Sequence, residues 1–206
     1  VKGEMLEVVR PYAKWIDVFC DKGAFTPDEA EEILDAGIAQ GLQGRLHGNQ
    51  LGDTGGIELA VKKKLASVDH VTYSTDKQLE SLAGAGVTAT LLPGAEFSTR
   101  SPYPDSRRFY SVGVNVALAT DCNPGSSYIS SMPFVIALAV RDMHFSPEQA
   151  LTAATLGGAQ ALRRTDIGHL SVGAQADIVI LNAPRFEYLA YRAGSNLIKR
   201  VLVRGL

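Results

Sequence analysis

Cysteine is scarce in this sequence, and the chain also lacks an excess of positive charge. Its 206 residues include two cysteines, Cys20 and Cys122, which lie too far apart to form the dense disulfide framework of a small secreted domain. We therefore expect a protein of the reducing cytoplasm. Lys and Arg number 20 and Asp and Glu number 22, so the formal net charge is -2 and nucleic acid is not an expected partner.

Long hydrophobic runs are missing as well. The apolar stretch from Val112 to Ala119 is interrupted by Gly113 and Asn115, and it is far shorter than the roughly 20 residues of a membrane-spanning helix. The first residues, VKGE, show no basic region followed by an apolar one, so we expect neither a membrane partner nor a secretory signal. The lack of an initiator Met favours a chain that starts inside a longer protein.

The overall composition is that of a globular protein. Hydrophobic residues make up 46% and charged residues 20% of the chain, which argues against disorder, a fibrous repeat or a coiled coil. The length gives room for one ordinary domain with a small appendage. Neither GxGxxG after a strand nor GxxxxGK occurs, so a nucleotide-binding fold is not indicated.

Short β-rich runs alternate with helical patterns, which predicts parallel βα units. The expected strands are residues 15–20, 44–47, 67–73, 87–93 and 115–121, and most are apolar on both faces. The expected helices between them are residues 27–40, 55–65, 76–85 and 105–112. Three helix starts, at Thr26, Thr75 and Ser146, carry capping patterns.

The pattern changes after residue 121. Residues 132–143 and 147–164 are expected to be helices, and a glycine-rich connection then leads to short strands at 176–181 and 197–203. This organisation divides the chain into βα layers over residues 1–165 and a small β appendage over residues 166–206.

The fold class is therefore α/β. Five parallel strands cannot close a barrel by themselves, so the sheet is either open and doubly wound or part of a larger (β/α)8 barrel. The missing nucleotide motif favours the incomplete (β/α)8 TIM-type barrel with a small C-terminal β appendage. Its two open sheet edges favour association and are compatible with a homodimer.

Three polar residues stand at the ends of three expected strands: His47, His70 and Asp121. In a parallel barrel these ends converge on the rim where catalytic residues collect. Imidazole nitrogen and carboxylate oxygen are ligands that zinc prefers. One such histidine alone would more often be structural, but three matching positions predict a shared metal or catalytic site.

The segment after Asp121 is expected to be a tight polar loop. It reads CNPGSS over residues 122–127, in which Asn123 and Ser126 can present donors and acceptors to a ligand. Gln50, three residues after His47, either binds a substrate amide or caps the following segment. We expect the two cysteines to be packing residues rather than nucleophiles.

The other two histidines are expected to have no part in the chemistry. His144 precedes a helix cap, and His169 lies in the glycine-rich connection. Both are interpreted as structural or solvent-facing.

On these residues the chain resembles the amidohydrolase superfamily. The matching motifs are HGNQ at 47–50, VDH at 68–70, LLPG at 91–94, ATDCNPGSS at 119–127 and GAQAD at 173–177. Within the superfamily the likeness is closest to the hydrolases that open the imidazolone ring in histidine degradation. The DCNPGSS loop is the specific feature, and the likeness covers essentially all of the chain as the C-terminal half of a protein about twice as long.

The resemblance implies a role for each matching residue. His47 corresponds to the metal ligand on the fifth barrel strand and Asp121 to the one on the eighth, so the expected strands would be about strands 4 to 8 of the barrel. His70 corresponds to the sixth-strand histidine that contacts the hydrolytic water and the substrate oxygen. Positions that hold the substrate correspond to Gln50, Asn123, Gly125 and Ser126.

The implied cofactor is one zinc or iron ion. The implied reaction is metal-dependent hydrolysis of the cyclic amide of a small-molecule substrate, 4-imidazolone-5-propanoate, to N-formimidoyl-L-glutamate. Asp121 would take the proton of the water and pass it to the leaving nitrogen, and His70 would polarise the carbonyl.

One departure from the family pattern stands out. The family places a His-x-His pair on its first strand, whereas the four histidines here are residues 47, 70, 144 and 169. We therefore expect weak metal binding and no turnover from this chain alone. The alternatives are a purine or pyrimidine deaminase of the same superfamily and a non-catalytic domain that binds a partner.

Overall fold

The computed structural model describes residues 2–206, and they form two compact units. One unit contains the residues up to Thr90 together with Arg108–Asn115. The other contains Leu91–Arg107 and Val116–Leu206.

A parallel sheet runs through the βα part of the chain. Its order is β1-β2-β3-β4-β5, and the pairs β1–β2, β2–β3 and β3–β4 are parallel. The strands are β1 (Trp15–Cys20), β2 (Gln43–Gly48), β3 (Ser67–His70), β4 (Thr88–Leu91) and β5 (Val116–Leu118). The parallel βα organisation expected from the sequence is thus confirmed.

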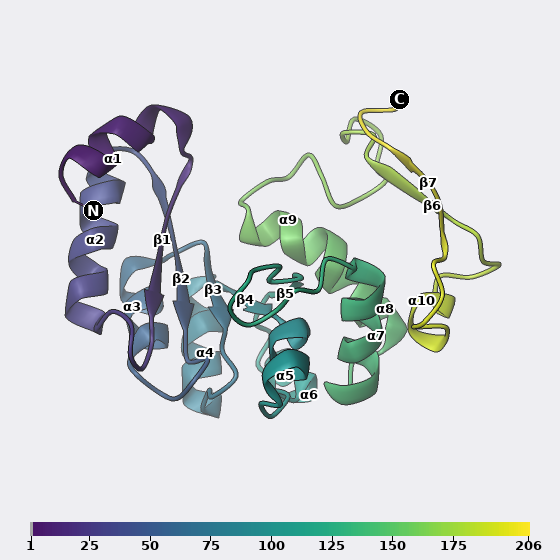
Figure 1. The fold of residues 1–206 in the computed structure, drawn as a ribbon, viewed down its shortest axis with the longest axis horizontal. Coiled ribbons are helices and arrows are strands. Elements are labelled where there is room, and N and C mark those ends of the chain that lie inside the picture. The colour runs from purple at the N-terminus through teal and green to yellow at the C-terminus, as the bar shows by residue number, and fades with distance from the viewer. Residues whose placement is uncertain (1) are drawn as a thin grey trace. The chain divides into compact units, whose positions relative to one another are not determined.

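Helices precede and connect the strands in the first unit (Figure 1). They are α1 (Glu4–Val9), the 3-10 turn η1 (Arg10–Tyr12), α2 (Pro27–Ala39), α3 (Gly56–Lys63) and α4 (Asp76–Ala85). Helix α2 packs on β1 and β2, and α3 packs on β2 and β3. The buried side chains Leu34, Leu46 and Ile57 fill this layer, each contributing about 1.5–3 kcal/mol through removal from water.

The three predicted capping patterns are confirmed. Thr26 with Glu29, Thr75 with Gln78, and Ser146 with Gln149 form complete capping boxes, in which each side chain satisfies a free backbone N–H at the helix start.

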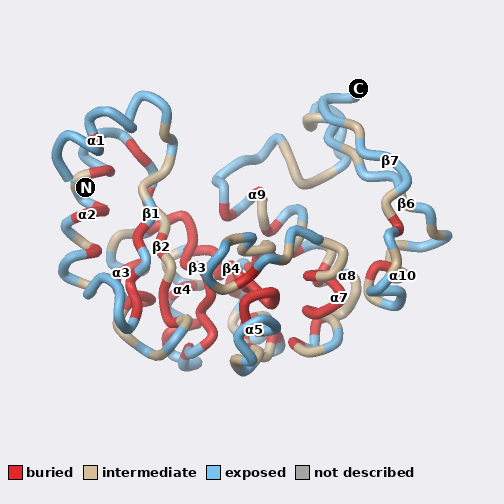
Figure 2. Tube along the Cα trace, viewed as in Figure 1, coloured by how far each residue is buried: buried red, intermediate tan, exposed pale blue. Residues whose placement is uncertain are grey.

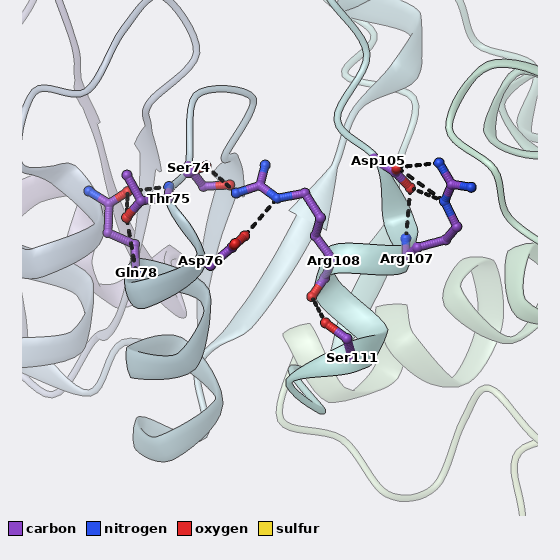
Figure 3. A network of polar contacts seen from close by, with 8 residues as sticks. All are labelled: Ser74, Thr75, Asp76, Gln78, Asp105, Arg107, Arg108 and Ser111. Atoms are coloured by element: carbon purple, nitrogen blue, oxygen red, sulfur yellow. Dashed lines mark hydrogen bonds and ion pairs between the residues drawn. The ribbon is translucent and has the colours of Figure 1, made fainter.

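The start of α4 also receives a contact from a later helix, α6 (Ser106–Ser111). The guanidinium of Arg108 donates to Asp76 Oδ1 at 2.8 Å and to the Ser74 carbonyl at 2.7 Å (Figure 3). Within the second unit, Arg107 pairs with Asp105 at 2.6 Å.

Burial differs between the strands (Figure 2). Every residue of β3 and β4 is buried. In β1, however, the exposed side chains of Asp17 and Phe19 alternate with the buried Val18 and Cys20. Most strands were expected to be apolar on both faces, and β1 is an exception.

Three expected strands of the sheet are shorter than predicted. The run at 115–121 is reduced to β5, Val116–Leu118. The run at 67–73 ends at His70, because His70 and Val71 have φ values of 79° and 47° and so leave the extended region. The run at 87–93 ends at Leu91, and Pro93 instead begins helix α5 (Pro93–Thr99). The fixed φ of proline suits the first turn of a helix.

The second unit is largely helical. Its further helices are α7 (Met132–Asp142), α8 (Pro147–Thr152), the π-helical turn η2 (Ala153–Gly157), α9 (Gly158–Ala161) and α10 (Tyr188–Tyr191). Segments α8, η2 and α9 follow one another without a break and correspond to the single helix predicted at 147–164. A side chain at position 157 would clash with the Val116 carbonyl. Because Gly157 has no side chain, η2 packs directly on β5.

The C-terminal strands form a separate sheet. Strands β6 (Ile178–Leu181) and β7 (Ile198–Leu202) pair antiparallel, with an irregularity between Ile180 and Leu181. This confirms the two short strands predicted there. Helices α1, α5 and α10 were not predicted. None of the helices among residues 2–206 is both long and apolar enough to cross a membrane.

Candidate functional site

Two histidines meet at the ends of neighbouring strands in the first unit. His47 lies near the end of β2, and His70 is the last residue of β3, paired in register with Gly48. Their ring centroids are 5.5 Å apart, with an angle of 52° between the ring planes. His70 is buried and His47 is half-buried. The sequence-based expectation that these two side chains lie together is met.

Burial keeps the ring of His70 neutral. Desolvation is the largest cause, and the neighbouring His47 adds to it, so the pKa of His70 falls from its ordinary value to about 3, against a smaller opposing effect of Asp17. The Nδ1 atom of His70 is buried and has no hydrogen-bond partner among the described residues. At neutral pH this ring can therefore donate through one nitrogen and accept, or bind a cation, through the other.

The ring of His47 is held by side chains of β1. Its Nδ1 lies 3.1 Å from Asp17 Oδ1. The ring of Phe19, which is paired with His47 in the strand register, meets it edge-on at a centroid distance of 6.1 Å.

A second carboxylate on the same sheet face belongs to Asp69 of β3. Its two oxygens accept hydrogen bonds from one guanidinium nitrogen of Arg45 at 3.2 and 3.0 Å. The hydroxyl of Ser67 donates to Asp69 Oδ1 at 3.0 Å. The charge of Asp69 is therefore balanced within the sheet.

The loop after β2 is tied to the end of β1. The buried carboxylate of Asp21 accepts hydrogen bonds from the backbone N–H of Gln50 at 2.6 Å and of Leu51 at 3.2 Å. Helix α3 starts after Gly55 without a side-chain cap. Gln50 is therefore held by its backbone, and its side chain does not cap helix α3.

In the second unit, Asp121 lies in a loop that is organised by its own side chains. The Asn123 side-chain oxygen accepts from the N–H groups of Gly125 and Ser126 at 2.7 and 2.8 Å. The Asn123 amide donates to the Asp121 carbonyl at 2.6 Å. The hydroxyl of Ser126 donates to Asp121 Oδ2 at 2.9 Å.

These bonds fix the orientation of the Asp121 carboxylate. Asn123, Gly125 and Ser126, which the sequence suggested as substrate-binding residues, thus contact Asp121 or one another. Asp121 itself has a positive φ of 51°, an uncommon conformation that such local hydrogen bonds stabilise.

The LLPG motif packs directly against this loop. A Cβ on Gly94 would lie 2.9 Å from Ser127 Oγ and 3.2 Å from the Thr120 carbonyl oxygen. The Ser127 hydroxyl donates to that same carbonyl at 3.1 Å. Only glycine allows the start of α5 to approach the loop this closely.

The remaining sequence-based assignments have mixed outcomes. Cys20 is a buried packing residue, as expected, and burial followed by the charge of Asp21 raises the pKa of its thiol. Cys122 is exposed, so the packing role expected for it is wrong. His169 bonds to the Thr165 carbonyl at 2.9 Å and accepts from the Ser171 N–H at 3.3 Å, so both of its ring nitrogens are engaged by its own loop.

Sequence reasoning missed Asp17 and Asp21. Asp17 lies in the largely apolar strand WIDVFC, and Asp21 directly follows it. Their hydrogen-bond partners lie 29 or 30 residues away in the chain. The available signal was a carboxylate in the middle of an otherwise apolar strand, a position where charge is rarely left without a partner.

Known proteins match the chain over its whole length. The model of the amidohydrolase family covers residues 4–205. The imidazolonepropionase of Salinispora arenicola (strain CNS-205) is 61% identical over 100% of this chain and 53% of its own length. That of Mycolicibacterium smegmatis is 57% identical over 98% of this chain and 51% of its own length.

Solved structures share the fold at low sequence identity. A mutant atrazine chlorohydrolase from Arthrobacter aurescens TC1, complexed with zinc and atraton, has a TM-score of 0.74 at 20% identity over 92% of this chain and 49% of its own. An adenosine deaminase from Xanthomonas campestris with bound zinc has a TM-score of 0.71 at 22% identity over 99% of this chain and 54% of its own. The chain spans about half the length of the curated relatives it matches.

Proposed function

Since this chain belongs to the amidohydrolase family, we propose that it provides metal-binding and catalytic groups for hydrolysis of a cyclic amide. The proposed substrate is 4-imidazolone-5-propanoate and the product N-formimidoyl-L-glutamate. Support for the substrate comes from the imidazolonepropionases that are 57–61% identical to the chain. The reaction takes place in a reducing cytoplasm, in keeping with two free cysteines.

The proposed fold is part of a (β/α)8 barrel. Strands β1 to β5 would be strands 4 to 8, because sequential parallel order with intervening helices is the pattern of that barrel. Residues 1–165 would form this part, and residues 166–206, with the antiparallel pair β6–β7, the small β appendage.

His47 and Asp121 would hold one zinc or iron ion. The donor set fits such an ion, because it combines imidazole nitrogen with carboxylate oxygen. The unpartnered Nδ1 of the buried His70 is also consistent with a polar group that faces a ligand. Catalytic zinc usually has three protein ligands, so we propose that the additional length of the relatives supplies the others.

When bound, the ion would lower the pKa of a coordinated water to about 7. Neutral His70 donates an N–H hydrogen bond to the substrate carbonyl oxygen and stabilises the charge that develops there. Asp121 accepts the proton of the attacking water and transfers it to the leaving ring nitrogen as the C–N bond breaks. Ser126 holds the Asp121 carboxylate in the orientation that this transfer needs, and Gln50 contacts the substrate.

The observation that carries this proposal is the pairing of neutral His70 with His47 at adjacent strand ends. The test is a hybrid enzyme in which this chain replaces the matching segment of the Salinispora arenicola relative. With zinc or iron, the hybrid should consume 4-imidazolone-5-propanoate, while purines and pyrimidines remain unchanged. Turnover of a nucleobase instead would identify a deaminase, and a folded hybrid without turnover would favour a non-catalytic domain.

His70→Gln should lower kcat by about 10² to 10³, the usual cost of losing a donor to a developing oxyanion, and Asp121→Asn by about 10² to 10⁴, the usual contribution of a general acid or base. The matched control is His144→Gln, a change at an exposed histidine. Equal activity of all three variants would contradict the assigned roles.

A further inference from the structure

Asp17, in the middle of β1, is placed to control the protonation pattern of His47. We propose that Asp17 is a positioning residue that sets the tautomer of His47, with the hydrogen of the uncharged ring on Nδ1 and the lone pair on Nε2. The inference rests on the proposed function, because it concerns the nitrogen that His47 would offer to the metal.

The contact joins two neighbouring strands. Asp17 Oδ1 lies 3.1 Å from His47 Nδ1, a normal hydrogen-bond distance. In the parallel register Asp17 pairs with Arg45 and Phe19 pairs with His47. Asp17 therefore reaches His47 diagonally on one face of the sheet, where side chains two residues apart point the same way.

Arg45, the register partner of Asp17, is engaged elsewhere. Its guanidinium binds Asp69 of β3, the other neighbour of β2, at 3.0 Å. It also lies 5.8 Å from the centre of the Trp15 ring. The carboxylate of Asp17 is thus directed to the histidine rather than to the arginine across from it.

The direction of the hydrogen bond follows from the groups involved. An ionised carboxylate only accepts hydrogen bonds, so the shared hydrogen must belong to the ring nitrogen Nδ1. A neutral imidazole with hydrogen on Nδ1 has its lone pair on Nε2, which can then bind a metal. Carboxylates orient metal-binding histidines in this way in many proteins.

The ring is restrained in a second way as well. Phe19 meets it edge-on, with 78° between the ring planes. The hydrogen bond to Asp17 and the aromatic contact together limit rotation about both side-chain torsions of His47. The direction in which Nε2 points is therefore set by β1, before any ligand binds.

A separate metal site at Asp17, His47 and Asp69 is the competing interpretation, because their ligand atoms lie within 4.8 Å of one another. Asp69, however, already accepts from the Arg45 guanidinium with both oxygens and from Ser67. A cation bound there would face the positive charge of Arg45. The charges at this cluster favour orientation of His47 over a second metal site.

The test is the tautomer of His47, read from long-range 1H–15N correlation spectra of the metal-free chain at pH 8.5. His47→Gln assigns the signals. We expect hydrogen on Nδ1 in the native chain and in Asp17→Glu, which keeps a carboxylate. In Asp17→Ala, which has no acceptor for the Nδ1 hydrogen, the population with hydrogen on Nε2 should rise, while Asp28→Ala, a change at an exposed residue of α2, should leave the spectrum of His47 unchanged.

Hydrogen on Nε2 in the native chain, or an unchanged tautomer in a folded Asp17→Ala chain, would overturn the inference. Dispersed backbone amide spectra show whether each variant is folded, and if Asp17→Ala is not, the tautomer of the native chain decides alone. Zinc affinity provides a second readout, with an expected loss of about 10- to 100-fold in Asp17→Ala. Because the tautomer is measured without metal, absence of zinc binding would count against the proposed function and leave the positioning result intact.

Discussion

The imidazole rings of His47 and His70 lie with their centroids 5.5 Å apart at the ends of two adjacent parallel strands. One ring is half-buried and bonded to a carboxylate, and the other is buried and neutral. These different surroundings suit the roles that we propose for the two rings, with His47 binding a metal and His70 donating a hydrogen bond.

The buried His70 should make the metal-free chain sensitive to acid. Its pKa is about 3 in the folded chain and about 6.5 when unfolded. Between these values the unfolded chain binds the extra proton, so the free energy of unfolding falls as the pH drops below about 6.5, by up to about 1.4 kcal/mol per pH unit. Above about pH 6.5 the His70 ring is neutral in both the folded and the unfolded chain, so this loss of stability is absent.

Urea denaturation between pH 7 and pH 5 measures this dependence. His70→Gln should show a shallower loss of stability than the native chain, whereas His144→Gln should show the native slope. If His70→Gln keeps the full slope, His70 is not the buried neutral group.

The clash expected at Gly157 can be measured with a neighbouring glycine as control. Gly157→Ala should lower the free energy of unfolding by about 1–3 kcal/mol or more, because the added methyl group meets the Val116 carbonyl of β5. Gly158→Ala meets nothing within 4 Å and should be neutral or stabilising by about 0.5–1 kcal/mol. Thermal or chemical denaturation gives both values, and equal effects would mean that η2 does not pack directly on β5.

Removal of the Asp21 carboxylate should free the loop after β2. Asp21→Ala leaves the N–H groups of Gln50 and Leu51 without their acceptor, which should cost about 1–3 kcal/mol. Asp35→Ala removes a carboxylate from an exposed pair with Lys63 and should cost at most about 1 kcal/mol. Amide hydrogen exchange reads the loop directly: protection of Gln50 and Leu51 should fall in the first variant and persist in the second.

The two thiols should differ in reactivity. Cys122 is exposed, whereas Cys20 is buried with a raised pKa, and only the thiolate form reacts. Ellman's reagent at pH 8 should label one thiol quickly and the second only after denaturant is added. Cys122→Ser should abolish the fast phase, and a fast phase that remains would place Cys20 at the surface.

Much of the backbone could be predicted because its signals are local. The strand at Trp15–Cys20 and the helix at Asp76–Ala85 have the predicted bounds, since apolar runs and capping side chains mark them. Helix α5 was not predicted because it has only seven residues and no side-chain cap marks its start. The early end of β3 at His70 depends on a positive φ at a β-branched valine, a conformation that propensities oppose.

The site was predictable only in part. The positions of His47 and His70 at strand ends follow from the pattern of strands. The contact of Asp17 with His47 depends on strand register and on the competing pair between Arg45 and Asp69. Both are properties of the folded sheet, and a linear sequence does not display them.

The most direct test of the proposed metal site is anomalous X-ray diffraction at the zinc edge from crystals of the zinc-loaded hybrid enzyme. The account predicts one zinc ion, with a nitrogen of His47 at about 2.0–2.1 Å and a carboxylate oxygen of Asp121 at about 2.0–2.2 Å, and with His70 beside the bound water. A zinc ion bound by other residues, with His47 and Asp121 both outside its coordination shell, would contradict the account.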